Sequence, residues 1–228
     1  MKVEKNRLYA IATGDIVDSS KLSPPDRKRL LFVMQRASVA LRSFLKEAVP
    51  LEVDIFRGDS WQMFIAQPEK ALVAALYFRA YLKATMAPRR VDTRLAVGVG
   101  TIDFLPNDRV SKGDGEAFRY SGRALEELKG HHRMAFVFPR RFDEQIALAV
   151  QTVVYLIDAL VVRWTPRQAL AVLGALEGKN QDEIGAKWPG GPISQQAVAQ
   201  HLTKAGWHAL LHGIDFVNKE VKKICYEN

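Results

Sequence analysis

The chain has 228 residues, and its 33 Lys and Arg residues against 25 Asp and Glu residues give it a formal net charge of +8. Hydrophobic residues make up 48% and charged residues 25% of the chain, which argues against disordered, collagen-like and coiled-coil proteins. The single cysteine, Cys225, excludes a disulfide framework and a cysteine-based zinc site within one chain.

The beginning of the chain and its most apolar stretch both favour a protein that does not enter membranes. Residues 1–15 alternate charged and apolar residues and lack the continuous apolar segment of a signal peptide. Residues 146–162 are rich in apolar side chains, but Gln151 and Asp158 interrupt them before the roughly 20 apolar residues of a membrane span are reached. We therefore expect a soluble, cytoplasmic protein with no membrane partner.

The positive charge is unevenly distributed along the chain. Residues 1–139 contain 23 basic and 16 acidic residues, whereas residues 140–228 contain 10 and 9. A basic excess indicates an anionic partner, and here most of it belongs to the first part of the chain.

Strand and helix patterns alternate in the first part of the chain. The predicted elements are a strand at 8–15, a helix at 24–48, strands at 51–56 and 61–66 around a turn at 57–60, a helix at 68–82, a strand at 92–104, a helix at 116–128 and a strand at 134–138. This order predicts an α+β fold, a ferredoxin-like βαββαβ palm whose antiparallel-rich sheet is backed by helices on one face.

The pattern becomes helical throughout after Pro139. The predicted elements are a long helix at 142–163, a helix capped by Thr165 and Pro166 that stops at 178–180, a short helix at 181–188, a turn at 189–193 and a helix from Ser194. We therefore predict a palm domain at 1–139 and a small helical domain at 140–228, with the helix at 142–163 as a connector or dimer seam.

Two aspartates, Asp15 and Asp59, each follow a glycine beside a predicted turn. The plain interpretation is that Gly-Asp pairs are common turn residues. In the predicted sheet, however, the first strand and the hairpin are neighbours, so the two carboxylates can converge. Close carboxylates repel each other unless a cation lies between them, and oxygen ligands are the ones that a divalent metal prefers.

Four short motifs follow one another in the predicted palm. They are GDIVDSS at 14–20, RGDSWQMF at 57–64, RLAVGVG at 94–100 and GEAFRYSGR at 115–123. By their order, spacing and strand context, residues 8–138 resemble the class III nucleotidyl cyclase homology domain, in a divergent form close to the SatD family. The resemblance implies Mg or Mn held at Asp15, Ile16 and Asp59, a nucleotide ligand, and a triphosphate contact from Arg123.

Two positions depart from the cyclase pattern. Arg119 stands where the family has the asparagine that orients the ribose, and Ile55 stands where it has the base-specifying lysine. Because a positioned ribose and base supply much of the geometry for cyclisation, we expect a palm that binds a nucleotide or phosphate without cyclising it. Arg57, Arg119 and Arg123 suit phosphate, because guanidinium groups pair bidentately with oxyanions, although each is equally typical of solvated surface.

Residues 165–212 have the layout of a helix-turn-helix and resemble region four of sigma factors. Ile184, Val198 and Leu202 are expected to face the core. The residues expected to contact DNA are Ser194, Gln195, Gln196, Gln200, Thr203 and Lys204. The turn at 189–193 is longer than the usual three or four residues, and a helical bundle for dimerisation is the alternative.

These features predict a cytoplasmic, homodimeric DNA-binding regulator whose degenerate cyclase-like palm senses a nucleotide. Asp15, Asp59 and Arg123 instead favour the alternative of an active metal-dependent nucleotidyl cyclase with a helical regulatory module, which Arg119 and Ile55 oppose. A third alternative is an interaction adaptor that uses the palm as a scaffold.

Overall fold

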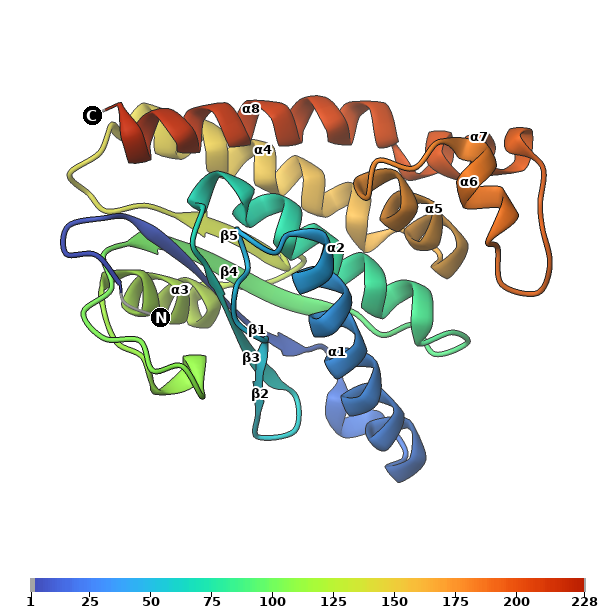
Figure 1. Cartoon of the computed structure of the whole chain (residues 1–228), viewed down its shortest axis with the longest axis horizontal. Coiled ribbons are helices and arrows are strands. Elements are labelled where there is room, and N and C mark those ends of the chain that lie inside the picture. The colour runs from blue at the N-terminus through green and yellow to red at the C-terminus, as the bar shows by residue number, and fades with distance from the viewer. Residues whose placement is uncertain (1–2, 228) are drawn as a thin grey trace.

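Five strands form one sheet in the order β2-β3-β1-β4-β5 in the computed structural model, which describes residues 3–227 (Figure 1). The strands are β1 (Tyr9–Ile16), β2 (Asp54–Phe56), β3 (Ser60–Ile65), β4 (Thr93–Gly100) and β5 (Met134–Val137). Neighbouring strands are antiparallel except β4 and β5, which are parallel. The predicted α+β class is confirmed, and the first four strands have the order of a βαββαβ unit.

Eight α-helices and three short 3₁₀ helices complete the described part of the chain. The α-helices are α1 (Pro24–Phe44), α2 (Ala71–Thr85), α3 (Glu116–Glu127), α4 (Glu144–Val162), α5 (Pro166–Leu176), α6 (Gln181–Ala186), α7 (Gln195–Ala205) and α8 (Trp207–Tyr226). The 3₁₀ helices are η1 (Ser19–Lys21), η2 (Pro68–Lys70) and η3 (Val110–Lys112).

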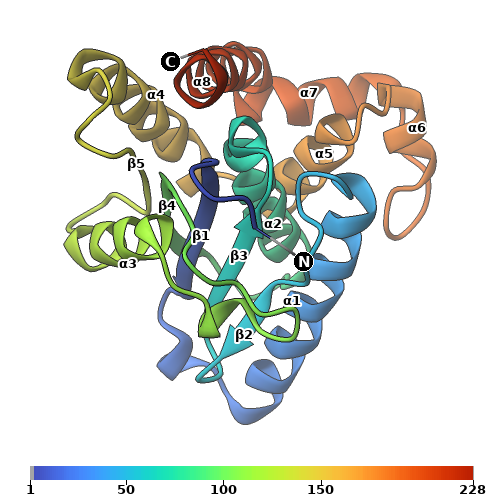
Figure 2. The same ribbon diagram turned by 60° about the vertical axis from the view of Figure 1, so that its left-hand side comes forward.

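Helices cover both faces of the sheet, so the prediction of helices on one face is wrong. Alternate residues of β1, such as Ala10 and Ala12, belong to the core shared with α1 and α2, whereas Tyr9 and Ile11 face α3 (Figure 2). The close approach of α3 depends on Gly98 in β4. A Cβ built there would lie 2.4 Å from the backbone nitrogen of Ser121, which leaves no room for a side chain.

Polar residues cap the beginnings of α1, α5, α6 and α7, and the sequence predicts two of these caps, Thr165 and Ser194. The Ser23 hydroxyl accepts a hydrogen bond from the backbone of Asp26, and Thr165 and Asn180 each form a capping box with the residue three positions later. Ser194 caps α7 as Ser23 caps α1, its hydroxyl accepting a hydrogen bond from the backbone of Ala197 at 3.3 Å.

Several predicted elements are longer than the observed ones. The first helix ends at Phe44 instead of residue 48, the second strand begins at Asp54 instead of residue 51, and β4 ends at Gly100 instead of residue 104. The sequence after α1 runs into Pro50, and the sequence after β4 turns away to form a single bridge between Phe104 and Asp114. Apolar residues in these connections are buried without belonging to a strand or helix, as Val49 and Ile102 show.

The C-terminal helices pack directly on the palm. Helices α5 and α8 lie against α2, and α4 lies between β5 and α8 (Figure 1). One continuous cluster of buried apolar residues includes both the sheet and these helices. The domain boundary at residue 139 therefore stays a prediction, because the two regions share a core.

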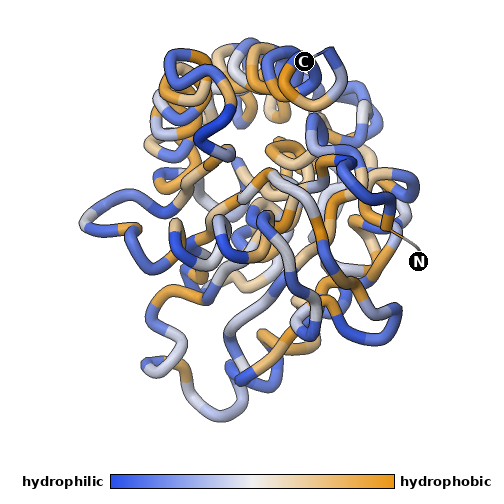
Figure 3. The backbone as a smooth tube through the Cα atoms, turned by 90° about the vertical axis from the view of Figure 1, so that its left-hand side faces the viewer, coloured by the Kyte–Doolittle hydropathy of each residue, from blue (hydrophilic) through white to orange (hydrophobic). Residues whose placement is uncertain are grey.

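Helix α4 is the most apolar element. An 18-residue window of it has a mean hydropathy of 1.9, so by length and composition this one helix could cross a membrane, contrary to the expectation from Gln151 and Asp158. Core helices of water-soluble proteins have the same composition, but only 28% of this window is buried. Figure 3 shows hydrophobic and hydrophilic residues alternating along the helices, and in α4 both Leu148 and Leu156 are 66% exposed.

Candidate functional site

Polar side chains gather at one end of the sheet, on the face that α3 covers only in part. Asp15 of β1 lies directly opposite Ser60 of β3 and Arg94 of β4, and Thr13 lies opposite Gln62. Because residues paired across antiparallel strands share a face, these side chains form one surface, which we call the polar end of the sheet. Buried hydrogen bonds support it, since the Thr13 hydroxyl lies 2.8 Å from that of Ser121 in α3.

Asp15 is held by Arg94. The Nε atom of Arg94 donates to both carboxylate oxygens of Asp15, at 2.8 and 3.0 Å, and Nη2 donates to Oδ2 at 2.8 Å. These hydrogen bonds raise the pKa of Arg94. The guanidinium thus neutralises Asp15 in a forked arrangement that uses both oxygens.

Asp59 lies at the same end of the sheet as Asp15. It follows a turn in which Arg57 and Gly58 both have positive φ angles, and its carbonyl oxygen accepts a hydrogen bond from the backbone of Ile16 at 3.1 Å. Its carboxylate accepts a hydrogen bond from the hydroxyl of Ser19 at 2.5 Å. Asp15 therefore lies on β1 and Asp59 in the turn that leads into the neighbouring strand β3, each with its own protein partner.

The residues of this site do not fit a resident divalent metal in the arrangement observed. Within residues 3–227, no three His, Cys, Asp or Glu side chains come together as a metal-binding group. Both oxygens of Asp15 are occupied by Arg94, which supplies the positive charge that a metal would supply. Ile16 is 3% exposed and its side chain lies in the core, so only its backbone reaches this end of the sheet.

Of the three predicted phosphate-binding arginines, Arg119 is already paired with carboxylates away from Asp15. Arg119 pairs with Asp114 at 3.0 Å and Asp103 at 3.4 Å, beyond the Gly100 end of β4 and away from Asp15. Arg57 in the hairpin turn and Arg123 on α3 are exposed, with no ion pair to any residue that the structure describes. Only Arg57 adjoins the Asp59 turn in sequence.

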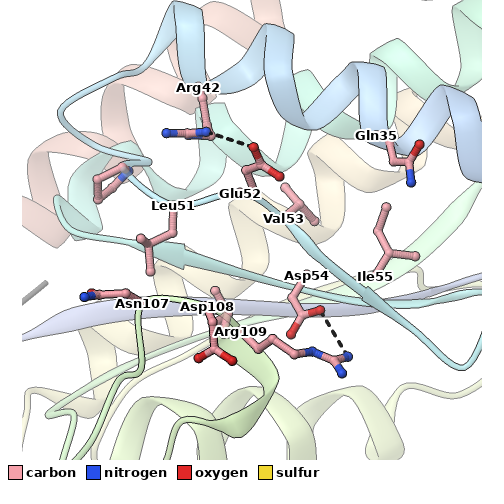
Figure 4. Close-up of a pocket in the computed structure, with 12 residues that line it drawn as sticks. Gln35, Arg42, Leu51, Glu52, Val53, Asp54, Ile55, Asn107, Asp108 and Arg109 are labelled. Atoms are coloured by element: carbon pink, nitrogen blue, oxygen red, sulfur yellow. Dashed lines mark hydrogen bonds and ion pairs between the residues drawn. The ribbon is translucent and has the colours of Figure 1, made fainter.

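Ile55 lines a pocket of about 410 Å³ beside Gln35 of α1 (Figure 4). Two ion pairs line this pocket, Arg42 with Glu52 at 3.2 Å and Arg109 with Asp54 at 3.4 Å. Burial would raise the pKa of Asp54, but hydrogen bonds from Ser111 and Arg109 lower it below its usual value.

The second candidate site is the exposed face of α7. Val198 and Leu202 are buried against α5 and α6, and Ile184 of α6 is 6% exposed, as the sequence predicts. The residues predicted to contact DNA are all exposed: Ser194, Gln195, Gln196, Gln200, Thr203 and Lys204. Gly185 allows this packing, because a Cβ there would lie 2.5 Å from the carbonyl oxygen of Ile193 in the turn.

His201 lies at the edge of this face, stacked on Trp188 with ring centroids 5.2 Å apart. Burial lowers the pKa of His201, and the nearby cations Arg167 and Lys204 lower it further. Lys204 of α7 and Arg167 of α5 therefore form a small basic group beside His201, which the nearly equal numbers of basic and acidic residues in the region do not reveal.

Two charged features of the structure are not predicted from the sequence. The first is Arg94, whose position directly across from Asp15 depends on strand register. The second is a buried network in which Arg79 of α2 donates to Asp92 at 2.7 Å and to Asp158 of α4 at 2.6 Å. A charged residue inside the apolar pattern of 71–85 is the signal that points to Arg79.

No family model and no curated protein matches the chain. Among solved structures, the chain is similar to the guanylyl cyclase Cya2, with 12% identity and a TM-score of 0.40 over 59% of this chain and 77% of that one. It is also similar to the catalytic core of a rhodopsin-guanylyl cyclase, with 17% identity and a TM-score of 0.39 over 56% and 76%. The adenylyl cyclase CyaB from P. aeruginosa gives 12% identity and a TM-score of 0.36 over 62% and 80%. Because these identities and TM-scores are low, the function of this chain has to be inferred from its own residues.

Proposed function

We propose that the protein is a DNA-binding regulator that contacts DNA through the exposed face of α7. The observation that carries the proposal is the division of α7 into two faces. Val198 and Leu202 dock onto α5 and α6, whereas the six polar residues predicted to contact DNA are all exposed. A helix held in this way can enter the major groove with its polar face toward the bases.

The side chains on this face have the chemistry of base reading. A glutamine pairs bidentately with the N6 and N7 atoms of adenine, so Gln196 and Gln200 favour A·T pairs. Lys204 and Arg167 supply the phosphate contacts. Since the region is nearly neutral, these contacts are few and the dependence of affinity on salt is shallow.

A homodimer is part of this proposal. Helix-turn-helix proteins read two half-sites with two copies of the reading helix, so a second copy of the chain is the expected partner. The exposed Leu148 and Leu156 of α4 supply an apolar stripe on which two copies could pair.

The experiment is selection of bound sequences from random duplex DNA by the full chain, followed by titration of the selected site at several salt concentrations. Replacing both Gln196 and Gln200 with Ala is expected to weaken specific binding at least tenfold, since each bidentate pair is worth about 1–3 kcal/mol. Gln145→Ala, an exposed glutamine at the start of α4, is the matched control. Absence of salt-dependent DNA binding by the unmodified protein would refute the proposal.

A nucleotidyl cyclase is the second candidate, favoured by Asp15 and Asp59 at the same end of the sheet. The pairing of Asp15 with Arg94 opposes it. Incubation with each nucleoside triphosphate and Mn, read by chromatography, decides between the two. A cyclic product that disappears in Asp59→Asn would establish the enzyme, whereas no turnover would leave the palm as a binding module.

A further inference from the structure

A second basic site lies where the palm meets the C-terminal helices. A cavity of about 260 Å³ opens there between the end of α2, the approaches to β4 and β5, and the junction of α4 with α5. Its charged lining consists of Lys83, Arg90, Arg133 and Arg163 against the single carboxylate of Asp92. We call it the junction cavity.

The carboxylates around the junction cavity are already paired with three cations, of which Arg79 and Lys83 are buried and Arg133 is partly exposed. Asp92 accepts hydrogen bonds from Arg79 at 2.7 Å, Lys83 at 3.0 Å and Arg133 at 2.8 Å. Behind it, Asp158 accepts from Arg79 and from the backbone of Arg133, both at 2.6 Å. Three cations thus face two anions before the cavity's outer arginines are counted.

Those outer arginines, Arg90 and Arg163, are exposed and have no ion pair within residues 3–227. The network therefore carries a surplus of three positive charges around one cavity. Like charges gathered around one cavity repel one another, and a bound anion would relieve that repulsion. The pKa of Lys83 is lowered mainly by its burial; Asp92 raises it, and the neighbouring cations Arg79 and Arg133 lower it further.

We infer that the junction cavity binds a phosphate group, either as inorganic phosphate or as a phosphomonoester. A phosphate, with a charge of about −1.5 to −2 at pH 7, offsets most of this surplus, and its oxygens suit the forks of Arg90 and Arg163. The cavity has room for the phosphate group and part of an ester, since liquid water occupies about 30 Å³ per molecule. The start of α5 at Thr165 lies on the rim and adds a favourable dipole.

A phosphate at this place would touch the palm and the helical region together. Lys83 and Arg133 belong to the palm, whereas Arg163 belongs to the end of α4, next to α5. The ligand would therefore hold the two regions in one arrangement. This inference does not depend on DNA binding by α7 or on any reaction at the polar end of the sheet.

The test is isothermal titration calorimetry of the full chain at constant ionic strength, with inorganic phosphate and then with a nucleoside 5′-monophosphate. The double variant Arg90→Ala, Arg163→Ala is expected to raise the Kd for phosphate at least about tenfold, as expected from the loss of charge-assisted hydrogen bonds. Because both arginines are exposed and unpaired, the variant should fold, and circular dichroism checks this. Arg163→Lys should retain part of the affinity.

Arg140→Ala is the matched control, because it removes one exposed, unpaired arginine at the opposite end of the sheet. Binding of phosphate alone would identify a free-phosphate site, and binding of both probes would identify a phosphomonoester site. The inference is overturned if neither probe binds, if the double variant binds as the unmodified protein does, or if Arg140→Ala weakens binding equally.

Discussion

Gly98 of β4 and Gly122 of α3 lie on two elements that pack together, but only Gly98 is in a crowded place. A Cβ at Gly98 would lie 2.4 Å from the Ser121 nitrogen and 2.5 Å from the Ala117 oxygen, both backbone atoms that cannot yield. A Cβ at Gly122 would have no atom within 4 Å. The first glycine is required by packing, whereas the second only weakens the helix.

Opposite effects on stability are therefore expected from the same substitution. Gly98→Ala should lower the free energy of unfolding by about 1–3 kcal/mol, because it overpacks the contact. Gly122→Ala should raise it by about 0.4–1 kcal/mol, because alanine favours the helix and restricts the unfolded chain. Urea denaturation of both variants measures this, and equal shifts in the same direction would contradict the structure.

At the residue scale, the sequence predicts features that depend on neighbouring residues, such as helix caps. It does not predict pairs of residues that are distant in the sequence. The caps at Thr165 and Ser194 are recognisable because a polar residue precedes a helical pattern by a fixed distance. The pairing of Asp15 with Arg94 joins residues 79 positions apart through strand register, which no local pattern encodes. The sequence thus predicts the carboxylates at the polar end of the sheet but not the arginine that neutralises one of them.

At the scale of elements, α4 combines a buried side with an apolar side that nothing in residues 3–227 covers. Val150, Val154 and Val161 lie in the core, whereas Leu148 and Leu156 are 66% exposed. The sequence predicts the helix correctly but not which of its faces is free, because both are apolar. Only the placement of β5 and α8 beside it distinguishes them.

The proposed homodimer predicts the behaviour of this stripe. The unmodified protein should sediment as a dimer at micromolar concentration, and the double variant Leu148→Glu, Leu156→Glu should sediment as a monomer, because it places charges in an apolar contact. Phe32→Glu is the control, since Phe32 is similarly exposed on α1. A monomeric unmodified protein, or a dimer unaffected by the double variant, would rule out this seam.

At the scale of the whole molecule, the buried charges of Arg79, Asp92 and Asp158 join the palm to the helical region. Burial would raise the pKa of Asp92, but the ion pairs with Arg79 and Lys83 dominate and hold it well below its usual value. A carboxyl group whose pKa is depressed in the folded state stabilises the fold above its unfolded pKa of about 3.9. That stabilisation is lost as the pH falls from there toward the folded pKa.

Asp92→Asn should therefore lower the free energy of unfolding by about 3–5 kcal/mol at neutral pH, because it leaves buried cations unpaired. The variant should also lose much of the decrease in stability that the unmodified protein shows below about pH 4. Denaturant titrations between neutral and acidic pH measure both effects. Asp103→Asn, which breaks an exposed pair, should cost less than about 1 kcal/mol; a comparable loss in the two variants would contradict this account.

The packing of α8 against the palm affects how the chain folds. Tyr226 at the end of α8 donates a hydrogen bond to Glu69 in η2, across 157 positions of sequence. Contacts between such distant segments slow folding, because the intervening chain must be ordered before they form. A ribosome therefore has to synthesise the chain past α8 before the common core can close. Until then the apolar side of α2 that α5 and α8 cover stays exposed, and exposed apolar surface favours aggregation.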